Sequence, residues 1–549
     1  MKSKLYGRFI PLIILSILLG TAVFAACDKK PKNGGQEKAQ YSVSFYSDGR
    51  QYGETVKVED GGKVTRPVDP TKEDFVFGGW FKEENCVNLW IFDTDTVEAN
   101  TILYAYWVVS QGVSYILNSD GESYQAKGTP SGTIGDIYIS ATYNNKPVTN
   151  IAAEGFADCA NITSVTISNG VTAIGGDAFN DCSKLERISI PDSVNSIGYR
   201  AFWGTDWYKN QPNGLIYAGK VAYAYKGTIP NDILQTFKPD TVGIGDRSFA
   251  FSNLKEVVIP DSVTNIGKSA FSGCERMTGL TIGRNVKSIG EDAFLRCGRL
   301  NSIIIPDSVT SIGSEAFSEC SGATSIILGS GVTDIGNSVF SYCSSLTKII
   351  IPDSFTRVGN GMFSNCESLT NVTIGSGVTH IDIKAFYCCT ALTTITIPNG
   401  VTRIDDEAFY DCQNLGNINI ADSVISIGKR AFDRTLWYNN HNNSTVVYAG
   451  RVAYDYKGQM PANTTIKFVS NTLAIADSAF SGLSGLTQIT IPQSVIKIGS
   501  KAFYRCINLG AINFEGTIDQ WNEITKEEGW KYDISAVAVK CGENDWTPL

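Results

Sequence analysis

A unit of 23 residues recurs fourteen times in this chain and constrains its fold more than any other feature. One regular copy, Leu300–Cys320, reads LNSIIIPDSVTSIGSEAFSEC. Successive marker phenylalanines lie 23 residues apart except for one step of 22 and two long steps of 47 and 48. The markers are Phe156, Phe179, Phe202, Phe249, Phe271, Phe294, Phe317, Phe340, Phe363, Phe386, Phe409, Phe432, Phe480 and Phe503. Such a period indicates one supersecondary unit stacked many times, and such stacks present binding surface more often than a catalytic pocket.

The pattern inside one copy predicts a short strand followed by turns. Alternation places Ile303 and Ile305 inside and Ile304 outside. Pro306-Asp307 turns the chain, since proline cannot donate to a continuing ladder. The Ala-Phe-x-x-Cys segment then forms a tight helical or 3₁₀ turn whose phenylalanine fills the core. The predicted fold is a solenoid of short parallel strands and turns over residues 156–513, capped by strands in 110–155 and by the tryptophan-rich segment 514–549.

Fourteen cysteines in an exported protein would usually suggest disulfides. Ten of them share one position, three residues after the marker Phe, and would form a ladder of thiols roughly 5 Å apart, which is within disulfide range. That position also accepts Thr205, Thr435 and Leu483, so a bridge is not required there. We interpret the ladder as small buried packing residues. The ten are Cys159, Cys182, Cys274, Cys297, Cys320, Cys343, Cys366, Cys389, Cys412 and Cys506.

The N-terminal segment predicts export. Residues 1–26 place three basic residues ahead of an apolar run of about ten residues, which is shorter than the roughly 20 of a membrane-spanning helix. The junction before Cys27 resembles a bacterial lipobox, so Cys27 is the predicted lipidation site; cleavage by the ordinary signal peptidase is the alternative. Residues 27–40 are predicted to be a flexible tether. The chain is therefore expected at the cell surface, attached to a bacterial membrane through an N-terminal lipid only.

Composition excludes several function classes. A net charge of −9 without basic runs argues against nucleic acid as a partner. The two histidines, His380 and His441, are isolated, and no phosphate loop, nucleophile elbow or metal-ligand spacing occurs. The sequence therefore predicts a non-catalytic protein without cofactor or metal, and we expect a monomer.

The outward strand positions are the first candidate binding surface. They are rich in hydroxyl groups and poor in charge, and they include an apolar stripe, as exposed interaction sites often do. Isoleucine and threonine are also favoured in any strand, so an ordinary sheet face is the competing interpretation. The candidate residues are Val258, Thr281, Ile304, Ile327, Ile350, Thr373 and Thr396.

The two long steps contain related inserts, at about 203–245 and 433–476. Each reads as a hairpin turning at Ala-Gly-Lys or Ala-Gly-Arg and followed by a degenerate coil. Their aromatic side chains could stack on sugars or anchor a protein, or they could pack on the solenoid and seal the interruption. The candidates are Trp207, Tyr208, Tyr217, Trp437, Tyr438 and Tyr448.

The repeat resembles the BspA-type leucine-rich repeat family, whose hallmark Ile-Pro-x-Ser-Val-Thr-x-Ile-Gly-x-x-Ala-Phe-x-x-Cys recurs here with little drift. The resemblance implies a right-handed solenoid with a parallel sheet along one face, in a surface protein acting in adhesion and partner recognition. Residues 41–109 resemble the internalin-type B-repeat, a small β-grasp module, through FGGW at Phe77–Trp80 and LYAYW at Leu103–Trp107.

Three functions remain open at this point. The first is a surface lipoprotein that binds extracellular protein, on a host or on a partner cell, through the exposed sheet face. The second is a surface glycan-binding protein that assists polysaccharide capture. The third is a structural envelope protein without a specific ligand.

Overall fold

The computed structural model describes residues 39–549 apart from 71, 73, 74, 85–87, 93, 110, 111 and 544. The predicted signal segment 1–26, Cys27 and nearly all of the predicted tether lie outside the described residues. The described chain divides into two compact units. The first ends at Pro67 and includes Phe81–Tyr104, and the second comprises Val68–Trp80 and Ala105–Leu549. Within the described ranges, no helix is both long and apolar enough to cross a membrane.

A small four-stranded sheet begins the described chain. Its strand order is β2-β1-β4-β3, with β1 antiparallel to β2 and parallel to β4. The alternating residues Val43 and Phe45 of β1 and Leu103 of β4 are buried, as the period of a one-faced strand requires. The expected small strand domain is therefore present. The strands are β1 (Gln40–Ser47), β2 (Arg50–Glu59), β3 (Phe75–Phe81) and β4 (Thr101–Val109).

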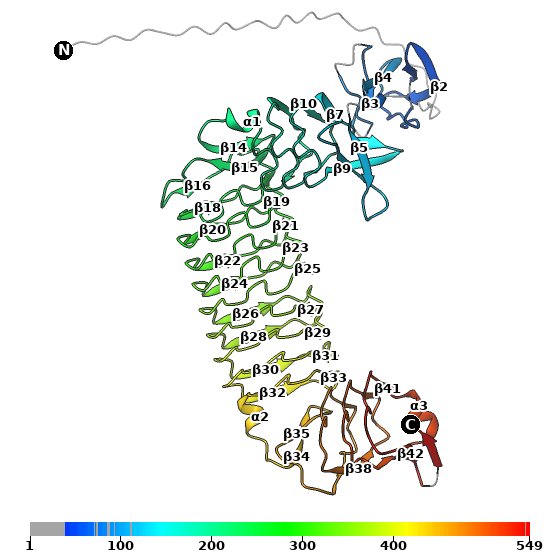
Figure 1. Ribbon diagram of the computed structural model, residues 1–549, viewed down its shortest axis with the longest axis vertical. Coiled ribbons are helices and arrows are strands. Elements are labelled where there is room, and N and C mark those ends of the chain that lie inside the picture. Colours follow the sequence, from blue (N-terminus) through cyan, green and yellow to red (C-terminus); the bar gives the residue numbers. More distant parts are fainter. Residues whose placement is uncertain are drawn as a thin grey trace, which may run out of the picture. The chain divides into compact units, whose positions relative to one another are not determined.

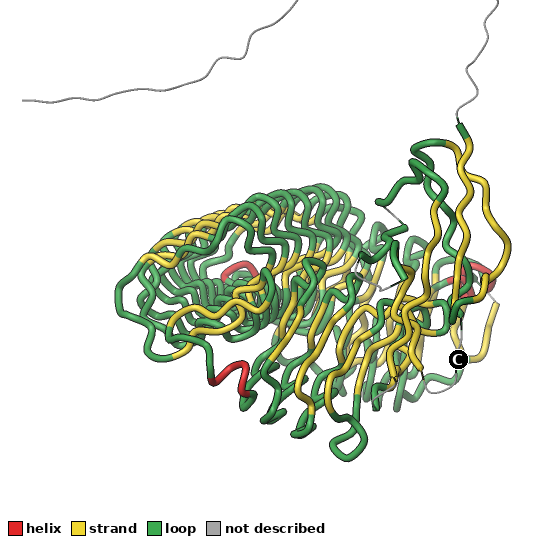
Figure 2. Tube along the Cα trace, turned by 90° about the horizontal axis from the view of Figure 1, so that it is seen from above, coloured by secondary structure: helices red, strands yellow, loops and turns green. Residues whose placement is uncertain are grey.

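The second unit is the predicted solenoid, whose coils stack one on another (Figure 1). Each regular coil contributes a strand of three or four residues to one row, which we name row A, and a two-residue strand to a second row, row B. Figure 2 shows the strands of successive coils lying along one another. Ser311–Ile312 and the equivalent pairs of the other coils form the second row, which the sequence analysis did not predict, so the solenoid carries two rows of parallel strands.

Rows A and B contain most of the strands. Row A consists of β7 (Gly135–Ile139), β10 (Ile162–Ile167), β12 (Arg187–Ser189), β16 (Leu234–Gln235), β18 (Glu256–Val258), β20 (Gly279–Thr281), β22 (Ser302–Ile304), β24 (Ser325–Ile327), β26 (Lys348–Ile351), β28 (Asn371–Ile374), β30 (Thr394–Ile397), β32 (Asn417–Ile420), β36 (Thr464–Lys467), β38 (Leu486–Ile491), β40 (Ala511–Phe514) and β42 (Ala538–Cys541). Row B consists of β9 (Lys146–Ile151), β11 (Ala173–Ile174), β13 (Ser196–Ile197), β17 (Gly243–Ile244), β19 (Asn265–Ile266), β21 (Ser288–Ile289), β23 (Ser311–Ile312), β25 (Asp334–Ile335), β27 (Arg357–Val358), β29 (His380–Ile381), β31 (Arg403–Ile404), β33 (Ser426–Ile427), β37 (Ala474–Ile475), β39 (Lys497–Ile498) and β41 (Thr525–Lys526).

The register of these strands equals the sequence period. Ile303 pairs with Ile326 in row A, and Ile312 pairs with Ile335 in row B. Ile303 and Ile305 are fully or almost fully buried, whereas Ile304 between them is 55% exposed. The predicted alternation is confirmed, because side chains of a strand point to its two faces in turn.

The third side of each coil is a turn built around the marker phenylalanine. The amide groups of three residues, the Phe and the residues two before and two after it, donate to carbonyls of the next coil. In the coil of Phe294 the donors are Asp292, Phe294 and Arg296. Asp292 and Arg296 have φ of 55° and 61°, so left-handed residues flank each Phe and prevent a continuous 3₁₀ helix. The segment is therefore a series of single turns.

The phenylalanine rings form a stacked column inside the solenoid. Neighbouring rings from Phe249 to Phe432 lie 5.0–5.8 Å apart, with interplanar angles of 5–17°. All marker phenylalanines are buried completely. Because each ring covers the next, the column is continuous only while every coil supplies a Phe.

The cysteine ladder has a hydrogen-bonding role. Each thiol of the regular ladder from Cys297 to Cys412 lies within 3.5 Å of the carbonyl oxygen of the Phe in the preceding coil and donates to it. Burial raises the pKa of the Cys343 thiol to about 12, so sulfur keeps the proton that it donates. The twelve described cysteines are free thiols, which agrees with the interpretation of the ladder as buried packing residues.

Each insert replaces one coil by a short helix and a hairpin. Helix α1 (Asp206–Lys209) precedes β14 (Gly214–Ala218) and β15 (Val221–Lys226), and α2 (Leu436–Asn439) precedes β34 (Thr445–Ala449) and β35 (Val452–Lys457). The hairpins turn at Gly219-Lys220 and Gly450-Arg451, as predicted. β15 and β35 then take the place of a row B strand, because they pair in parallel with β17 and β37.

The hairpin coils lack the Phe turn, and a tyrosine takes over its contact. The amide of Phe202 donates to the hydroxyl of Tyr223 (3.0 Å) instead of to a carbonyl, and the amide of Phe432 donates to Tyr454 in the same way (3.0 Å). Each tyrosine ring also packs edge-on against the Phe that precedes it. The phenol therefore satisfies a buried donor that would otherwise have no acceptor.

Both ends of the solenoid are strand structures. At the start, β5 (Ser114–Leu117) and β6 (Tyr124–Lys127) pair antiparallel, and β8 (Thr142–Tyr143) pairs with β9. At the end, α3 (Ile518–Glu523) follows a Thr517 cap, and β43 (Asp545–Pro548) pairs antiparallel with β42. The amide of Phe503 donates to the carbonyl of Trp530, whose ring covers the last Phe.

The tyrosine phenols should matter for stability. We expect Tyr223→Phe to lower the free energy of unfolding by about 1–3 kcal/mol, because it leaves the buried amide of Phe202 without an acceptor. Urea unfolding of the full chain measures this. Tyr217→Phe is the matched control, since the Tyr217 hydroxyl accepts from the exposed amide of Lys238. Equal losses for the two variants would contradict the assigned role.

Candidate functional site

The outward face of row A is the first candidate surface. Ile304, Ile327 and Ile350 are 55%, 55% and 53% exposed, and Val258 is 40% exposed. Ile304 lies in register with Ile327. Thr281, Thr373 and Thr396 are exposed at the same repeat position. The structure thus brings all seven candidates into one line, and adjacent coils place them about 4.8 Å apart.

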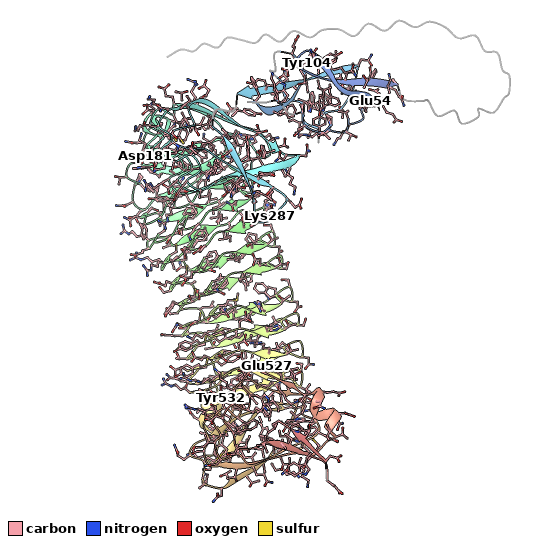
Figure 3. All side chains as sticks on the ribbon, turned by 45° about the vertical axis from the view of Figure 1, so that its right-hand side comes forward. Glu54, Tyr104, Asp181, Lys287, Glu527 and Tyr532 are labelled. Atoms are coloured by element: carbon pink, nitrogen blue, oxygen red, sulfur yellow. The ribbon has the colours of Figure 1, made fainter. Side chains whose placement is uncertain are left out.

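A shallow hollow adjoins the apolar part of this line. Its volume is about 480 Å³, and it is lined by side chains of β26, β28 and β30 and the residues before them. Threonine dominates the lining, with Lys348 and Asn371 at one side. The face therefore combines an isoleucine stripe with a hydroxyl-lined depression. Figure 3 shows the side chains that project from the stacked coils along the chain.

The first insert opens a notch on the turn side of the solenoid. In regular coils the amide two residues before the Phe donates to the next coil, as Asp177 does to the carbonyl of Tyr199 (2.8 Å). In the coil of Phe202, the amide at this position is that of Arg200. The next coil is the hairpin coil, and it has no phenylalanine turn whose carbonyl could accept from this amide. Among the described residues, neither the Arg200 amide nor the Gly204 amide finds an inter-coil acceptor.

The opposite wall of the notch presents acceptors. The opposite wall belongs to the coil of Phe249, two coils after that of Phe202. In regular coils, the carbonyls at the positions of Asp246 and Ser248 accept hydrogen bonds from amides of the preceding coil. No backbone donor reaches them from any described residue. The missing turn therefore leaves amide donors on one wall and carbonyl acceptors on the other.

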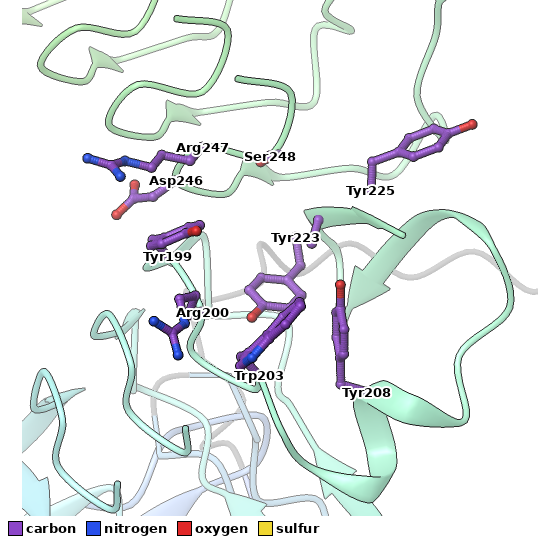
Figure 4. Close-up of a pocket in the computed structure, with 10 residues that line it drawn as sticks. Tyr199, Arg200, Trp203, Tyr208, Tyr223, Tyr225, Asp246, Arg247 and Ser248 are labelled. Carbon is purple, nitrogen blue, oxygen red and sulfur yellow. The ribbon is translucent and has the colours of Figure 1, made fainter. Parts of the chain in front are cut away.

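Aromatic and charged side chains surround the notch (Figure 4). The pocket has a volume of about 450 Å³ and is lined by both walls and by Tyr223 and Tyr225 between them. Tyr199 and Trp203 belong to the coil before the insert, and Tyr208 to helix α1. Tyr199 and Trp203 are 46% and 48% exposed, and the Trp203 and Tyr208 rings lie 5.3 Å apart.

The two arginines of this pocket differ in their ion pairing. Arg200 is held by Asp177 (3.5 Å) and by the side-chain oxygen of Asn180 (3.2 Å). Arg247 is exposed, lies 5.1 Å from the centre of the Tyr199 ring, and has no carboxylate within 4.0 Å among the described residues. Burial raises the pKa of the Asp246 carboxyl, although the Lys268 amide donates to it at 2.7 Å. Arg247 thus forms no salt bridge within 4.0 Å among the described residues, although Asp246 and Asp292 lie near enough to interact with its charge.

The model of the BspA type Leucine rich repeat region matches residues 140–227, 242–366, 333–460 and 453–525, which together exceed half of the chain. The chain belongs to the BspA type leucine rich repeat family. Residues 41–106 match the Listeria-Bacteroides repeat domain, which agrees with the resemblance of this segment to the B-repeat. The repeats that the sequence analysis identified are thus those of a BspA type protein.

Individual relatives match only parts of this BspA type protein. Two proteins of Evansella cellulosilytica, named "Putative membrane protein" and "Putative Gly-rich membrane protein", are 37% and 41% identical over 95 and 71 residues. These matches cover 17% and 13% of the chain and only 14% and 8% of those proteins.

Solved structures of leucine-rich repeat proteins are also similar. One from Bacteroides ovatus is 24% identical, with 79% of this chain and all of that chain covered and a TM-score of 0.36. A leucine rich cell surface protein of Faecalibacterium prausnitzii is 25% identical, with 77% and 98% covered and a TM-score of 0.28. Membership of the family therefore rests on the repeats themselves.

The predicted insert aromatics have different surroundings in the BspA type fold. Trp207 packs on Phe202 (5.2 Å) and Trp437 on Phe432 (5.4 Å). The hydroxyls of Tyr217 and Tyr448 accept from backbone amides, and Tyr438 donates to Asp455. Tyr208 alone of the six lines the pocket of the first insert. The others contact the solenoid, as the interpretation of a sealed interruption expects, and a binding role for them stays a prediction.

Sequence reasoning missed Tyr199, Trp203 and Arg247, three exposed residues that line the pocket. Tyr199 could have been found by aligning the repeats on the marker phenylalanine. Three residues before the marker Phe, the other copies have small, polar or aliphatic residues, and Tyr199 is the single aromatic there. The sequence signal for the pocket is therefore an aromatic residue at a solvent-facing repeat position, directly before the insert that lacks a phenylalanine turn.

The second insert forms a smaller notch of about 230 Å³ with different chemistry. Lys429 stands where the first notch has Tyr199, Asp433 where it has Trp203, and Ser478 where it has Arg247. Asp455 replaces Ala224 and accepts a hydrogen bond from Tyr438. Burial raises the pKa of Asp433 and raises that of Asp455 to about 6. The second notch is therefore lined mainly by charged side chains, three aspartates with Lys429 and Arg430, and lacks the exposed aromatic rings of the first.

The raised pKa of Asp455 predicts a pH-dependent stability. The native state holds this proton more tightly than the unfolded chain, whose pKa is near 3.8, so deprotonation destabilises the fold as pH rises from about 4 to about 6. About two pKa units correspond to at most about 3 kcal/mol. We expect Asp455→Asn to remove this component.

Urea unfolding at pH 4 and pH 7 measures the effect. The stability of the wild type should fall relative to that of Asp455→Asn between the two pH values. Glu275→Gln, at an exposed site, is the control and should follow the wild type. Parallel pH profiles for wild type and Asp455→Asn would show that Asp455 titrates normally.

Proposed function

We propose that this BspA type protein is a non-catalytic cell-surface scaffold that binds a partner protein through the outward face of row A. The observation that supports the proposal best is the isoleucine stripe. Three isoleucines more than half exposed occupy one repeat position in consecutive coils, although water-facing positions of a monomeric solenoid need no such residues.

The chemistry of the face suggests its partner. From β18 to β30 its outward positions carry one acid, Glu256, and one base, Lys348, and are otherwise hydroxyl, amide or apolar. The partner should therefore offer an apolar ridge for the stripe and uncharged polar groups for the hollow lined by threonines. The seven coils from Val258 to Thr396 span about 29 Å at about 4.8 Å per coil, so the face is an elongated strip.

Replacing the stripe should weaken binding without unfolding the chain. We expect the triple variant Ile304→Ser, Ile327→Ser and Ile350→Ser to lose at least tenfold in affinity for the protein bound, because the apolar contact is lost. Partners would be found on an array of purified extracellular-matrix proteins beside an array of glycans, and affinities measured by surface plasmon resonance.

The chain offers a matched control for this variant. Ile383, Ile496 and Ile507 are 45%, 49% and 50% exposed but lie off this face, so their triple serine variant removes equal apolar surface elsewhere. It should bind like the wild type. Unchanged affinity in the stripe variant would exclude this surface. Binding to glycans but to no protein would favour polysaccharide capture. The absence of binding on both the protein array and the glycan array would favour a structural envelope role.

Attachment to the membrane through Cys27 is the second part of the proposal. The sequence of residues 1–27, with a short apolar run and a lipobox-like junction, supports export followed by lipidation. A tether of about 13 residues would then separate the lipid from the folded units. This arrangement would hold the binding face outside the cell.

Lipidation makes a direct prediction. In a bacterial host with lipoprotein processing, the wild-type chain should incorporate labelled palmitate and enter the detergent phase of Triton X-114. Cys27→Ser should lose the label completely, because no thiol remains at the junction. Cys86→Ser, which removes a cysteine elsewhere, should keep it. A labelled Cys27→Ser chain, or an unlabelled wild type, would instead indicate ordinary cleavage and release.

A further inference from the structure

The notch beside the first insert combines features of a small-ligand site that the row A face lacks. Its volume of about 450 Å³ falls within the roughly 300–1000 Å³ of ligand pockets. It lies on the turn side of the coils, and row A is on another side, so the two sites are independent. Its floor is formed by Tyr223, which the Phe202 amide holds in place.

The ring surfaces of the notch favour a ligand with an aliphatic face. Tyr199, Trp203 and Tyr208 come from two elements and line one side of the pocket, with two of the rings about half exposed (Figure 4). The faces of aromatic rings are negative and attract the weakly positive C–H groups of a saturated ring. A pyranose offers such a face and carries hydroxyl groups around its edge.

The polar groups of the notch match those hydroxyls. The carbonyls of Asp246 and Ser248 and the Asp246 carboxyl can accept from hydroxyl donors, whereas the Arg200 amide can donate to a hydroxyl oxygen. Regular coils satisfy such groups with each other, and here the missing turn separates them. A saccharide, which donates and accepts at every hydroxyl, can bridge the two walls.

The guanidinium of Arg247, which forms no salt bridge within 4.0 Å among the described residues, adds a charge requirement. Arg247 stands at the mouth of the pocket over the Tyr199 ring, and Arg200 lies on the facing wall. Guanidinium groups bind carboxylates through paired charge-assisted hydrogen bonds. We propose that the notch binds a carboxylated saccharide, such as a uronic or sialic acid residue, with its ring on Trp203 and Tyr199 and its carboxylate at Arg247.

The second notch shows which residues the proposal depends on. Its backbone arrangement is the same, including the phenol that replaces a carbonyl acceptor. It lacks both half-exposed rings, and Ser478 stands at the position of Arg247. Three aspartates, Asp433, Asp455 and Asp477, line it beside Lys429 and Arg430, whereas Asp246 is the one aspartate that lines the first notch, so a carboxylate meets more like charge in the second. Only the first notch should therefore bind an acidic sugar.

Glycan arrays of uronic and sialic acid glycans with matched neutral glycans test this with the full chain. Each hit is compared with its methyl ester by isothermal titration calorimetry. We expect retention of carboxylated glycans and at least a tenfold loss on esterification. Arg247→Ser, which introduces the residue found at the equivalent position of the second notch, and Trp203→Ala should each weaken binding at least tenfold.

Lys429→Ser is the matched control, because it removes one exposed positive charge from the second notch. It should bind within twofold of the wild type. Urea midpoints like that of the wild type would show that the Arg247→Ser and Trp203→Ala chains remain folded. The proposal is overturned if the array retains no carboxylated glycan, if esters or neutral glycans bind equally, or if Arg247→Ser binds normally.

Discussion

Hydrogen bonds between the turns of successive coils are the constraint on which the rest of this solenoid depends. Each turn of a regular coil that is followed by another regular coil donates three amides to it, and two of the donors lie in the left-handed region, as Asp292 and Arg296 do around Phe294. Non-glycine residues adopt this conformation at a cost of order 1–3 kcal/mol each. The inter-coil bonds and the stacked rings offset that cost, so the turn is stable only inside the stack.

The residue three after the phenylalanine differs between most regular coils and the two coils that precede the inserts. Cysteine at this position donates its thiol proton to the Phe carbonyl of the preceding coil and lets the chain proceed to the next strand. Thr205 and Thr435 instead donate to the Phe of their own coil and accept from an amide three residues on, which begins α1 and α2. One side-chain change at a ladder position thus accompanies each departure from the regular coil.

Much of this architecture could be predicted from the sequence, because period and alternation directly reflect burial. The burial of Ile303, the exposure of Ile304, the phenylalanine core and the hairpins at Gly219 and Gly450 all follow from local pattern. The notches could not be predicted in this way. They depend on which backbone groups lose a partner when a turn is missing, and the phenols that replace those partners lie 21 and 22 residues away in sequence.

The two notches show how a repeat protein can acquire different sites on one scaffold. Their frames agree in the threonine cap, the hairpin and the tyrosine acceptor, all of which maintain the stack. Their lining residues differ at positions that contact water in ordinary coils, where substitution costs little stability. Because the frame supplies the opening and the solvent positions supply the chemistry, Arg247 and Trp203 can diverge to Ser478 and Asp433 without disturbing the coils on either side.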